Sequence, residues 1–174
     1  DFLGLCVEEL HRSKEVELEI IVVDNDSEDQ THEIAKELRE KNIIDQYLPQ
    51  TENRGCAGGN NIGWQAAKNP LILMLNADCV VQPHTIRNMA NELDEIAQTG
   101  CVGALLFYPN SKKIQHAGAE IYSNGIANHY GRNFEATDDF QQRRTVDFVT
   151  GACLMYRKSD MENLGGFDED YYPA

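Results

Sequence analysis

The sequence predicts an α/β fold in which a doubly wound, mostly parallel sheet carries a smaller antiparallel region. Apolar runs at 18–23, 71–75 and 101–107 alternate with segments of helical periodicity. The runs are apolar over most of their length and do not alternate regularly with polar residues, which is typical of parallel strands covered on both faces. The alternation of strand and helix supports the same architecture, and 174 residues suffice for about one domain.

The first elements can be placed from their spacing. Apolar residues recur at helical intervals near the start of the chain: Leu3, Cys6, Val7 and Leu10. We expect a helix there, followed by the strand at 18–23. Ser27 and Gln30 have the spacing of a capping box, which predicts that a second helix begins at Ser27. A short strand is expected at 43–48.

The middle of the chain continues the alternation. A glycine- and asparagine-rich segment, 53–61, leads into a helix through Trp64 that ends before Pro70. The strand at 71–75 follows at once. A further helix, with apolar residues three and four positions apart, ends at Gly100 and precedes the strand at 101–107.

Beyond Tyr108 the pattern changes. Three glycines separate short segments there: Gly118, Gly125 and Gly131. The segments at 119–122 and 126–130 have the length of short strands. This part is therefore predicted to be the smaller antiparallel or loop-rich region.

Composition restricts the classes of partner. The chain has 29 acidic and 15 basic residues, a net charge of −14, and no basic run longer than two residues. Such a chain repels nucleic acid and anionic membrane surfaces, so we expect no nucleic-acid partner. An acidic protein that handles phosphates is expected to use a divalent cation.

The cysteines and the hydropathy pattern bear on location. Five cysteines without a Cys-x-x-Cys pair are typical of reduced thiols in an intracellular protein. No apolar stretch reaches the ~20 residues that span a bilayer, and the chain does not open on a signal peptide. We therefore expect a cytoplasmic protein; association with the inner face of the membrane, through parts outside this segment, stays open.

Two carboxylates follow apolar strands. Asp24 ends the run at 18–23, and Asp78 follows the run at 71–75 through Asn76 and Ala77. Because open α/β sheets bind ligands at the carboxyl ends of their strands, these side chains predict one acidic crevice. The glycine-rich segment is neither a dinucleotide fingerprint nor a P-loop. A diphosphate bridged to a carboxylate by a hard cation fits the residues that are present.

Five motifs then occur in order: Val-Val-Asp-Asn-Asp-Ser (22–27), Glu-Asn-Arg-Gly-Cys-Ala-Gly-Gly-Asn-Asn (52–61), Leu-Asn-Ala-Asp (75–78), Thr-Gly-Ala-Cys (150–153) and Gly-Gly-Phe-Asp-Glu (165–169). Together they resemble the family 2 glycosyltransferases of GT-A fold, in particular the bacterial rhamnosyltransferase-like branch that builds surface polysaccharides. The resemblance implies inverting transfer of a sugar from a dTDP- or UDP-sugar to a saccharide or lipid-linked acceptor hydroxyl.

The resemblance also implies a set of substrate-binding residues: Asp24, Asn25, Ser27, Asn53, Gly58, Gly59, Asn60, Asn76 and Asp78. Asp24 would contact the pyrimidine base, and Asn25 and Ser27 would shape the turn. Asn53 and the turn at 58–60 would line the nucleotide pocket.

The metal site implied by the resemblance has one carboxylate. Asn76-Ala77-Asp78 stands where the family has its Asp-x-Asp motif, so Asp78 would bind Mg2+ or Mn2+ on the diphosphate. Asn76 replaces the first acid. The cation would neutralise charge that builds on the leaving nucleoside diphosphate.

The chain departs from the family at both ends. By this resemblance, the chain opens in the helix that follows the family's first central strand. It stops before the Glu-Asp pair that usually contains the general base. We expect an incomplete GT-A domain, with a nucleotide-sugar part at 1–107 and an acceptor-side part at 108–174. No catalytic residue is assigned, the segment is expected to be inactive alone, and the open sheet edges could pair with a neighbouring molecule.

Plainer interpretations stay open for several residues. Asp24 and Ser27 could cap a helix, Asp78 could be a loop carboxylate, and Gly58 and Gly59 could serve a plain turn. His116 and His129 are expected to be surface or core histidines without a chemical role. Two other functions also stay open: a non-catalytic nucleotide-binding domain of the same fold, and a sugar-1-phosphate nucleotidyltransferase.

Overall fold

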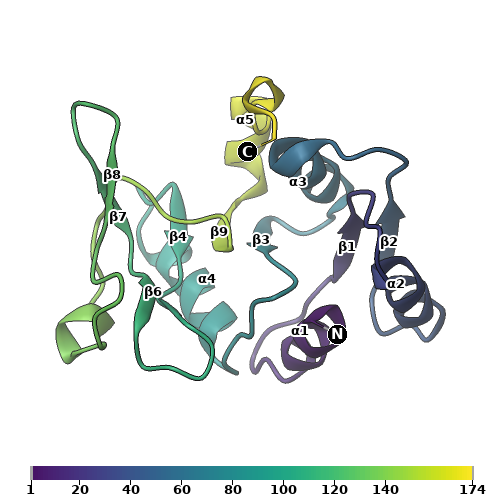
Figure 1. Ribbon diagram of the computed structural model, residues 1–174, viewed down its shortest axis with the longest axis horizontal. Helices are drawn as coiled ribbons and strands as arrows, with labels where there is room; N and C mark the ends of the chain where they lie inside the picture. Colours follow the sequence, from purple (N-terminus) through teal and green to yellow (C-terminus); the bar gives the residue numbers. More distant parts are fainter. Residues whose placement is uncertain (1, 174) are drawn as a thin grey trace.

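The computed structural model describes residues 2–173. Its N-terminal half contains these elements: α1 (Phe2–His11), β1 (Ile21–Asp24), α2 (Thr31–Glu40), β2 (Gln46–Pro49), α3 (Gly55–Ala66), β3 (Leu71–Leu75) and α4 (Thr85–Glu95). In Figure 1, α1 and α2 lie with β1 and β2 on one side of the molecule, and β3 lies near its centre. The predicted alternation of strands and helices is thus confirmed, with the strand at 71–75 placed at its expected bounds.

The C-terminal half consists of shorter elements: β4 (Cys101–Gly103), β5 (Leu106–Phe107), β6 (Ile114–His116), β7 (Ala119–Ile121), β8 (Ala127–His129), η1 (Asp138–Gln141), β9 (Cys153–Arg157), α5 (Lys158–Leu164) and η2 (Glu169–Tyr171). β5 pairs with β6 and β7 pairs with β8, both antiparallel. The β7–β8 hairpin projects from the body of the molecule (Figure 1). These strands form the smaller antiparallel region that the sequence predicts.

The main sheet is less parallel than expected. β1 and β2 form a parallel pair, whereas β9 lies between β3 and β4 and runs antiparallel to both. β9 comes from the part of the chain after Tyr108, and it occupies the position that a parallel β3–β4 pair would need. Within the described residues, β1 and β3 are not hydrogen-bonded to each other, so the strands form separate sheets.

Several predicted boundaries are wrong: α4 ends at Glu95 and not at Gly100, and β2 begins at Gln46 and not at residue 43. Two further differences have a clear local reason. The capping box at Ser27 does not form, because the Ser27 amide donates to Asp24 Oδ1 at 3.0 Å in a turn. α2 begins only at Thr31, whose amide donates to Asp29 Oδ1 at 2.9 Å. The predicted strand at 101–107 is divided, because β4 pairs with β9 and β5 pairs with β6.

The core consists of three apolar clusters. One joins α4 to β9 and includes Met89, Leu93 and Met155. The second joins α1, β1 and α2, and the third packs Trp64 of α3 against Tyr156 of β9. Because β9 contributes to two of the clusters, it connects the C-terminal half to the sheet that carries β3.

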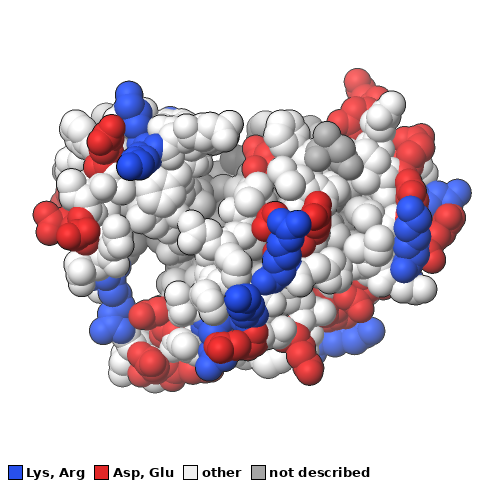
Figure 2. All heavy atoms as spheres, turned by 90° about the horizontal axis from the view of Figure 1, so that it is seen from below, with Lys and Arg blue, Asp and Glu red and all other residues white. Residues whose placement is uncertain are grey.

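The surface reflects the acidic composition. On the face shown in Figure 2, lysine and arginine side chains are interspersed with aspartate and glutamate and form no large basic patch. Among residues 2–173, no helix is long and apolar enough to cross a membrane.

Candidate functional site

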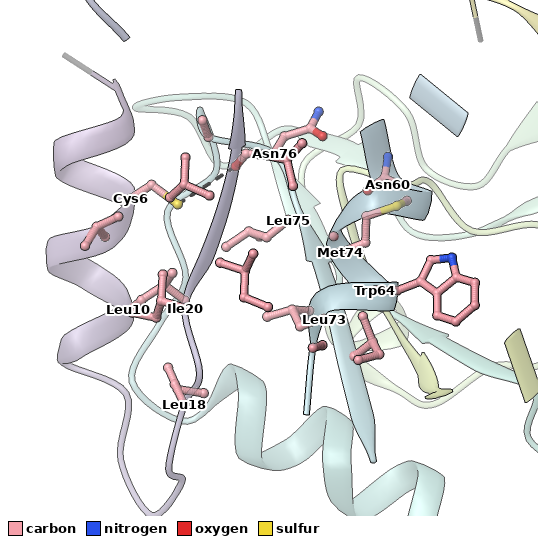
Figure 3. Close-up of a pocket in the computed structure, with 18 of the residues that line it drawn as sticks. Cys6, Leu10, Leu18, Ile20, Asn60, Trp64, Leu73, Met74, Leu75 and Asn76 are labelled. Carbon is pink, nitrogen blue, oxygen red and sulfur yellow. Dashed lines mark hydrogen bonds between the residues drawn. The ribbon is translucent and has the colours of Figure 1, made fainter. Parts of the chain in front are cut away.

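A cavity of about 1200 Å³ lies between α1, β1, α3 and β3. The two ends of the cavity differ in polarity (Figure 3). Leu10, Leu18 and Leu73 line the apolar end, whereas Asn60 and Asn76 lie toward the other end, where the strands terminate. Burying a polar ligand among leucines without hydrogen bonds costs several kcal/mol, roughly 2–7 by transfer measurements. The part of the cavity suited to a polar ligand is therefore the end at the strand termini.

The turn after β3 is held by the chain segment that precedes β9. The Asn76 amide donates to Ala152 O at 3.0 Å, and Cys79 Sγ lies 3.4 Å from the same carbonyl. The Cys79 amide closes the turn on Asn76 O at 3.0 Å. Asp78 projects from this turn into solvent at the mouth of the cavity.

Asn25 fastens the end of β1 to the start of α3. Its Nδ2 donates to Gly55 O at 3.0 Å and to Asn53 Oδ1 at 3.1 Å, and its Oδ1 accepts from the Arg54 amide at 2.9 Å. Every hydrogen-bonding atom of the amide side chain is engaged. Asn25 thus fixes the rim of the cavity between the end of β1 and the start of α3.

Asp24 is buried, with 5% of its surface exposed, and it does not line the cavity. Oδ1 accepts from the Ser27 amide at 3.0 Å, and Oδ2 accepts from the Tyr47 hydroxyl at 2.9 Å. Burial favours a higher pKa for this carboxyl, but the hydrogen bonds from Ser27 and Tyr47, with His32 nearby, lower the pKa below its ordinary value. In this structure Asp24 holds the turn after β1 in place.

The expected turn at 58–60 is helical. α3 begins at Gly55, so Gly58, Gly59 and Asn60 lie within the helix and not before it, and that prediction is wrong. A Cβ on Gly59 would stand 3.4 Å from Asn25 Nδ2, so the glycine allows the helix to approach the end of β1 closely. Asn60 Nδ2 donates to Cys56 O, one turn earlier, at 2.8 Å.

The N-terminus of α3 is partly used by the chain itself. The Cys56 amide donates to Pro173 O at 3.0 Å, and a Cβ on Gly55 would stand 2.8 Å from the Tyr172 ring. The free amides at the start of a helix can bind an anion. The structure assigns one of those amides to the C-terminal segment instead.

The structure brings together only part of the predicted set. The cavity-lining members are Asn25, Gly59, Asn60, Asn76 and Asp78. The members that do not line it are Asp24, Ser27, Asn53 and Gly58. The second group supports the first, since Asp24 and Asn53 accept the hydrogen bonds that fix the two loops at the rim.

One important polar residue was missed from the sequence. Asn61 is buried, and its Nδ2 donates to Phe167 O and to Glu169 Oε1, both at 2.9 Å. Its Oδ1 accepts from Trp64 Nε1 at 3.0 Å and from the Phe167 amide at 2.8 Å. Asn61 therefore ties α3 to the Gly-Gly-Phe-Asp-Glu segment. Asn61 is the last residue of the 52–61 motif, which is the signal that could have indicated it, whereas the predicted set contains its neighbour Asn60.

The acids of that segment have structural partners. Asp168 Oδ1 accepts from the Asp170 amide at 3.0 Å at the start of η2, and Glu169 Oε1 accepts the hydrogen bond from Asn61 Nδ2. The Asp168 contact agrees with loop structure there.

The turn after β3 offers oxygen atoms of the kind that a hard divalent cation binds. Asp78 is exposed, and Cys79 Sγ approaches its Oδ1 to 4.0 Å. Carboxylate and amide oxygens are ligands that Mg2+ and Mn2+ accept. Among residues 2–173, no three His, Cys, Asp or Glu side chains cluster to hold a metal. A cation here would therefore need ligand oxygens from a bound diphosphate and from water.

The thiols beside this turn are not ionised at neutral pH. Burial raises the pKa of Cys6 to about 11, with smaller contributions from Cys79 and Asp78. Burial and the charge of Asp78 also raise the pKa of Cys79. The negative charge at the turn thus belongs to Asp78.

Comparisons with known proteins agree on a family. The sequence model described as glycosyl transferase family 2 matches residues 1–165. The O-antigen biosynthesis protein RfbC of Myxococcus xanthus is 31% identical over 119 residues, which is 64% of this chain and 9% of RfbC.

Two solved structures share the fold. The mannosyltransferase PcManGT from Pyrobaculum calidifontis, in complex with GDP-Man and Mn2+, matches with a TM-score of 0.68 and 18% identity, over 97% of this chain and 44% of that chain. S. aureus TarS 1–349 in complex with UDP matches with a TM-score of 0.63 and 17% identity, over 99% and 48%. These likenesses confirm the predicted fold class, and this chain spans less than half of each of these three proteins.

Proposed function

Because this chain belongs to glycosyl transferase family 2, we propose that it forms the donor-binding part of an enzyme that transfers a sugar from a nucleotide diphosphate to an acceptor hydroxyl. The observation that carries the proposal is the turn after β3. It presents exposed Asp78 at the mouth of a cavity whose polar rim also contains Asn25 and Asn60. A carboxylate at the carboxyl end of a strand, facing such a rim, suits a diphosphate bridged by a cation.

The donor is proposed to be a dTDP- or UDP-sugar. Asn25, Gly59, Asn60 and Asn76 would contact the nucleotide and sugar directly, since they line the cavity. Asp24, Ser27, Asn53 and Gly58 would act mainly through the loops they hold. The complexes of PcManGT with GDP-Man and of TarS with UDP support a nucleotide ligand for this fold, although their bases differ.

The cation is proposed to be Mg2+ or Mn2+, held by Asp78 with Asn76 beside it. When bound, it would stabilise the negative charge that develops on the departing nucleoside diphosphate. The role of this chain's residues is to hold one carboxylate at a fixed place and to leave the remaining ligand positions to the diphosphate. The Mn2+ in the PcManGT complex supports this choice.

The acceptor is proposed to be a saccharide or a lipid-linked saccharide, within the synthesis of a surface polysaccharide by inverting transfer. The name of RfbC, an O-antigen biosynthesis protein, supports that setting. We assign no general base, and we expect the 174-residue chain alone to bind donor without transferring sugar.

Calorimetric titration of the chain with UDP and with dTDP, each with and without Mn2+, tests the donor site. We expect binding that requires Mn2+, and Asp78→Asn should weaken it by about tenfold or more, the effect of losing a charged contact. The matched control is Asp94→Asn, which removes an exposed acid on α4.

The outcome also separates the alternatives. Equal affinity of the Asp78→Asn variant and the unaltered chain would defeat the proposed metal site. A requirement for a nucleoside triphosphate with a sugar 1-phosphate would favour a nucleotidyltransferase. Binding of nucleotide without transfer by a version with longer ends would favour a non-catalytic domain.

A further inference from the structure

His116, the last residue of β6, is a buried imidazole with 3% of its surface exposed. Its Nε2 lies 3.1 Å from the Thr150 amide nitrogen, and its Nδ1 lies 2.9 Å from Nδ1 of His129. A backbone amide can only donate a hydrogen bond, so Nε2 must be the unprotonated nitrogen of His116. The single ring proton of neutral His116 therefore sits on Nδ1, which donates to His129.

The two imidazoles form a neutral pair. His129 accepts at Nδ1, and its own proton must then be on Nε2. Burial, followed by the nearby His129 and Arg132, lowers the pKa of His116 to about 4. Phe148 meets both rings edge to face, with centroids 5.8 Å from His116 and 6.0 Å from His129.

His116 is linked to the candidate site through three residues. Thr150 donates its amide to His116, and its Oγ1 lies 3.4 Å from the Ala152 amide nitrogen. Ala152 O in turn accepts the Asn76 amide at 3.0 Å. A Cβ on Gly151 would overlap the end of the Met74 side chain, so the segment lies directly against β3. Residues 150–152 are thus fixed by His116 at one end and by the turn that carries Asp78 at the other.

We propose that His116 is a positioning residue for the site around Asp78. By accepting the Thr150 amide, it keeps residues 150–152 against β3, so that Ala152 O can hold Asn76 and the turn. What Asp78 binds rests on the proposed function. The hydrogen-bonded path from His116 to Asn76 does not depend on the proposed function. The path and the binding of nucleotide can therefore be tested separately.

The first experiment compares three variants of the full chain in calorimetric titration with UDP and Mn2+. His116→Leu removes the acceptor for Thr150, whereas His116→Gln places a carbonyl oxygen near the position of Nε2. We expect about fivefold to tenfold weaker binding for the Leu variant, as for a lost hydrogen bond, and recovery to within about twofold for Gln. The matched control, His84→Gln, lies exposed at the start of α4 and should bind normally.

The second experiment needs no nucleotide. In the unaltered chain at neutral pH, imidazole nitrogen NMR should show a protonated Nδ1 and an unprotonated Nε2 in His116. In His116→Leu, hydrogen exchange should become faster at both Thr150 and Asn76. If the Leu variant does not fold, His116→Asn takes its place, since its amide is too short to reach Thr150.

Each result is decisive. A protonated Nε2, or faster exchange at Thr150 with Asn76 unchanged, overturns the positioning role. Equal nucleotide affinity in the Leu and Gln variants also overturns it. Absence of nucleotide binding by the unaltered chain refutes the proposed function, and exchange at Asn76 then decides the positioning role alone.

Discussion

At the scale of single residues, two asparagines hold the parts of the site in register. Asn25 connects β1 to the start of α3, and Asn61 connects α3 to the segment after α5. In each side chain both the amide nitrogen and the oxygen are engaged. An amide suits such a place because it donates and accepts without carrying a charge that burial would penalise.

Asn61→Ala is expected to lower the free energy of unfolding by about 2–4 kcal/mol, since it leaves buried partners such as Trp64 Nε1 unsatisfied. Urea denaturation followed by circular dichroism measures the change. Asn88→Ala, on the exposed face of α4, is the control and should change stability by less than about 0.5 kcal/mol. Similar values for both variants would show that the Asn61 contacts contribute little.

Asp24 gives the fold a dependence on acid. Its folded pKa lies below the ordinary 3.8, so it stabilises the fold above that value, and the contribution is lost as the pH falls through the lowered pKa. Tyr47→Phe removes one of its hydrogen bonds. Carboxyl NMR titration should then show a higher pKa for Asp24, whereas Tyr122→Phe, at an exposed residue, should leave it unchanged. An unchanged pKa in Tyr47→Phe would contradict the assigned cause.

At the scale of elements, the sequence pattern predicts those helices and strands whose bounds are determined by neighbouring residues. The strand at 71–75 is correct because an apolar run stands between Pro70 and Asn76. α4 lies where its periodicity predicts a helix, although it ends at Glu95 and not at Gly100. The helix start at Ser27 is wrong because Asp24 competes successfully for its amide. β9 pairs with β3 residues about eighty positions away and with β4 residues about fifty positions away, and no local pattern encodes this pairing.

The same distinction holds for the site. Asp78 and Asn76 were predicted at the end of a strand, and they lie at the mouth of the cavity. The contact of Ala152 with Asn76 and that of Asn61 with Glu169 depend on tertiary packing. Only the order of motifs indicated that these segments belong together.

Gly103 shows how closely an element can be packed. A Cβ at this end residue of β4 would stand 2.7 Å from Cβ of Val149, a branched side chain that cannot turn away. Gly103→Ala is therefore expected to lower the free energy of unfolding by about 1–3 kcal/mol in urea denaturation. Gly100→Ala meets no atom within 4 Å, and it should be neutral or slightly stabilising. Equal losses in both would refute a steric cause.

At the scale of the whole molecule, the two sequence halves are interwoven. β9 lies within the sheet that carries β3, and its Met155 packs in the same cluster as Leu93 of α4. Substitutions in the C-terminal half should therefore alter the conformation of the turn that carries Asp78. In contrast, β1 and β3 face each other across the cavity without pairing, and apolar side chains of both strands line it.

This arrangement predicts that the 174-residue chain associates with itself. Unpaired strand edges beside an apolar surface favour contacts with another chain. Sedimentation velocity over a range of concentrations should show a rising average mass. Leu73→Lys places a charge on β3 within the cavity, and it should shift the chain toward monomer.

Leu164→Lys separates an effect of the cavity from one of surface apolarity, since Leu164 at the end of α5 is 77% exposed. It should leave the association unchanged, and circular dichroism should show that both variants keep the helices of the unaltered chain. A monomer at every concentration would refute the self-association, and equal effects of the two lysines would place the contact outside the cavity. A selective effect of Leu73→Lys would instead identify the facing edges of β1 and β3 as the surface through which the chains meet.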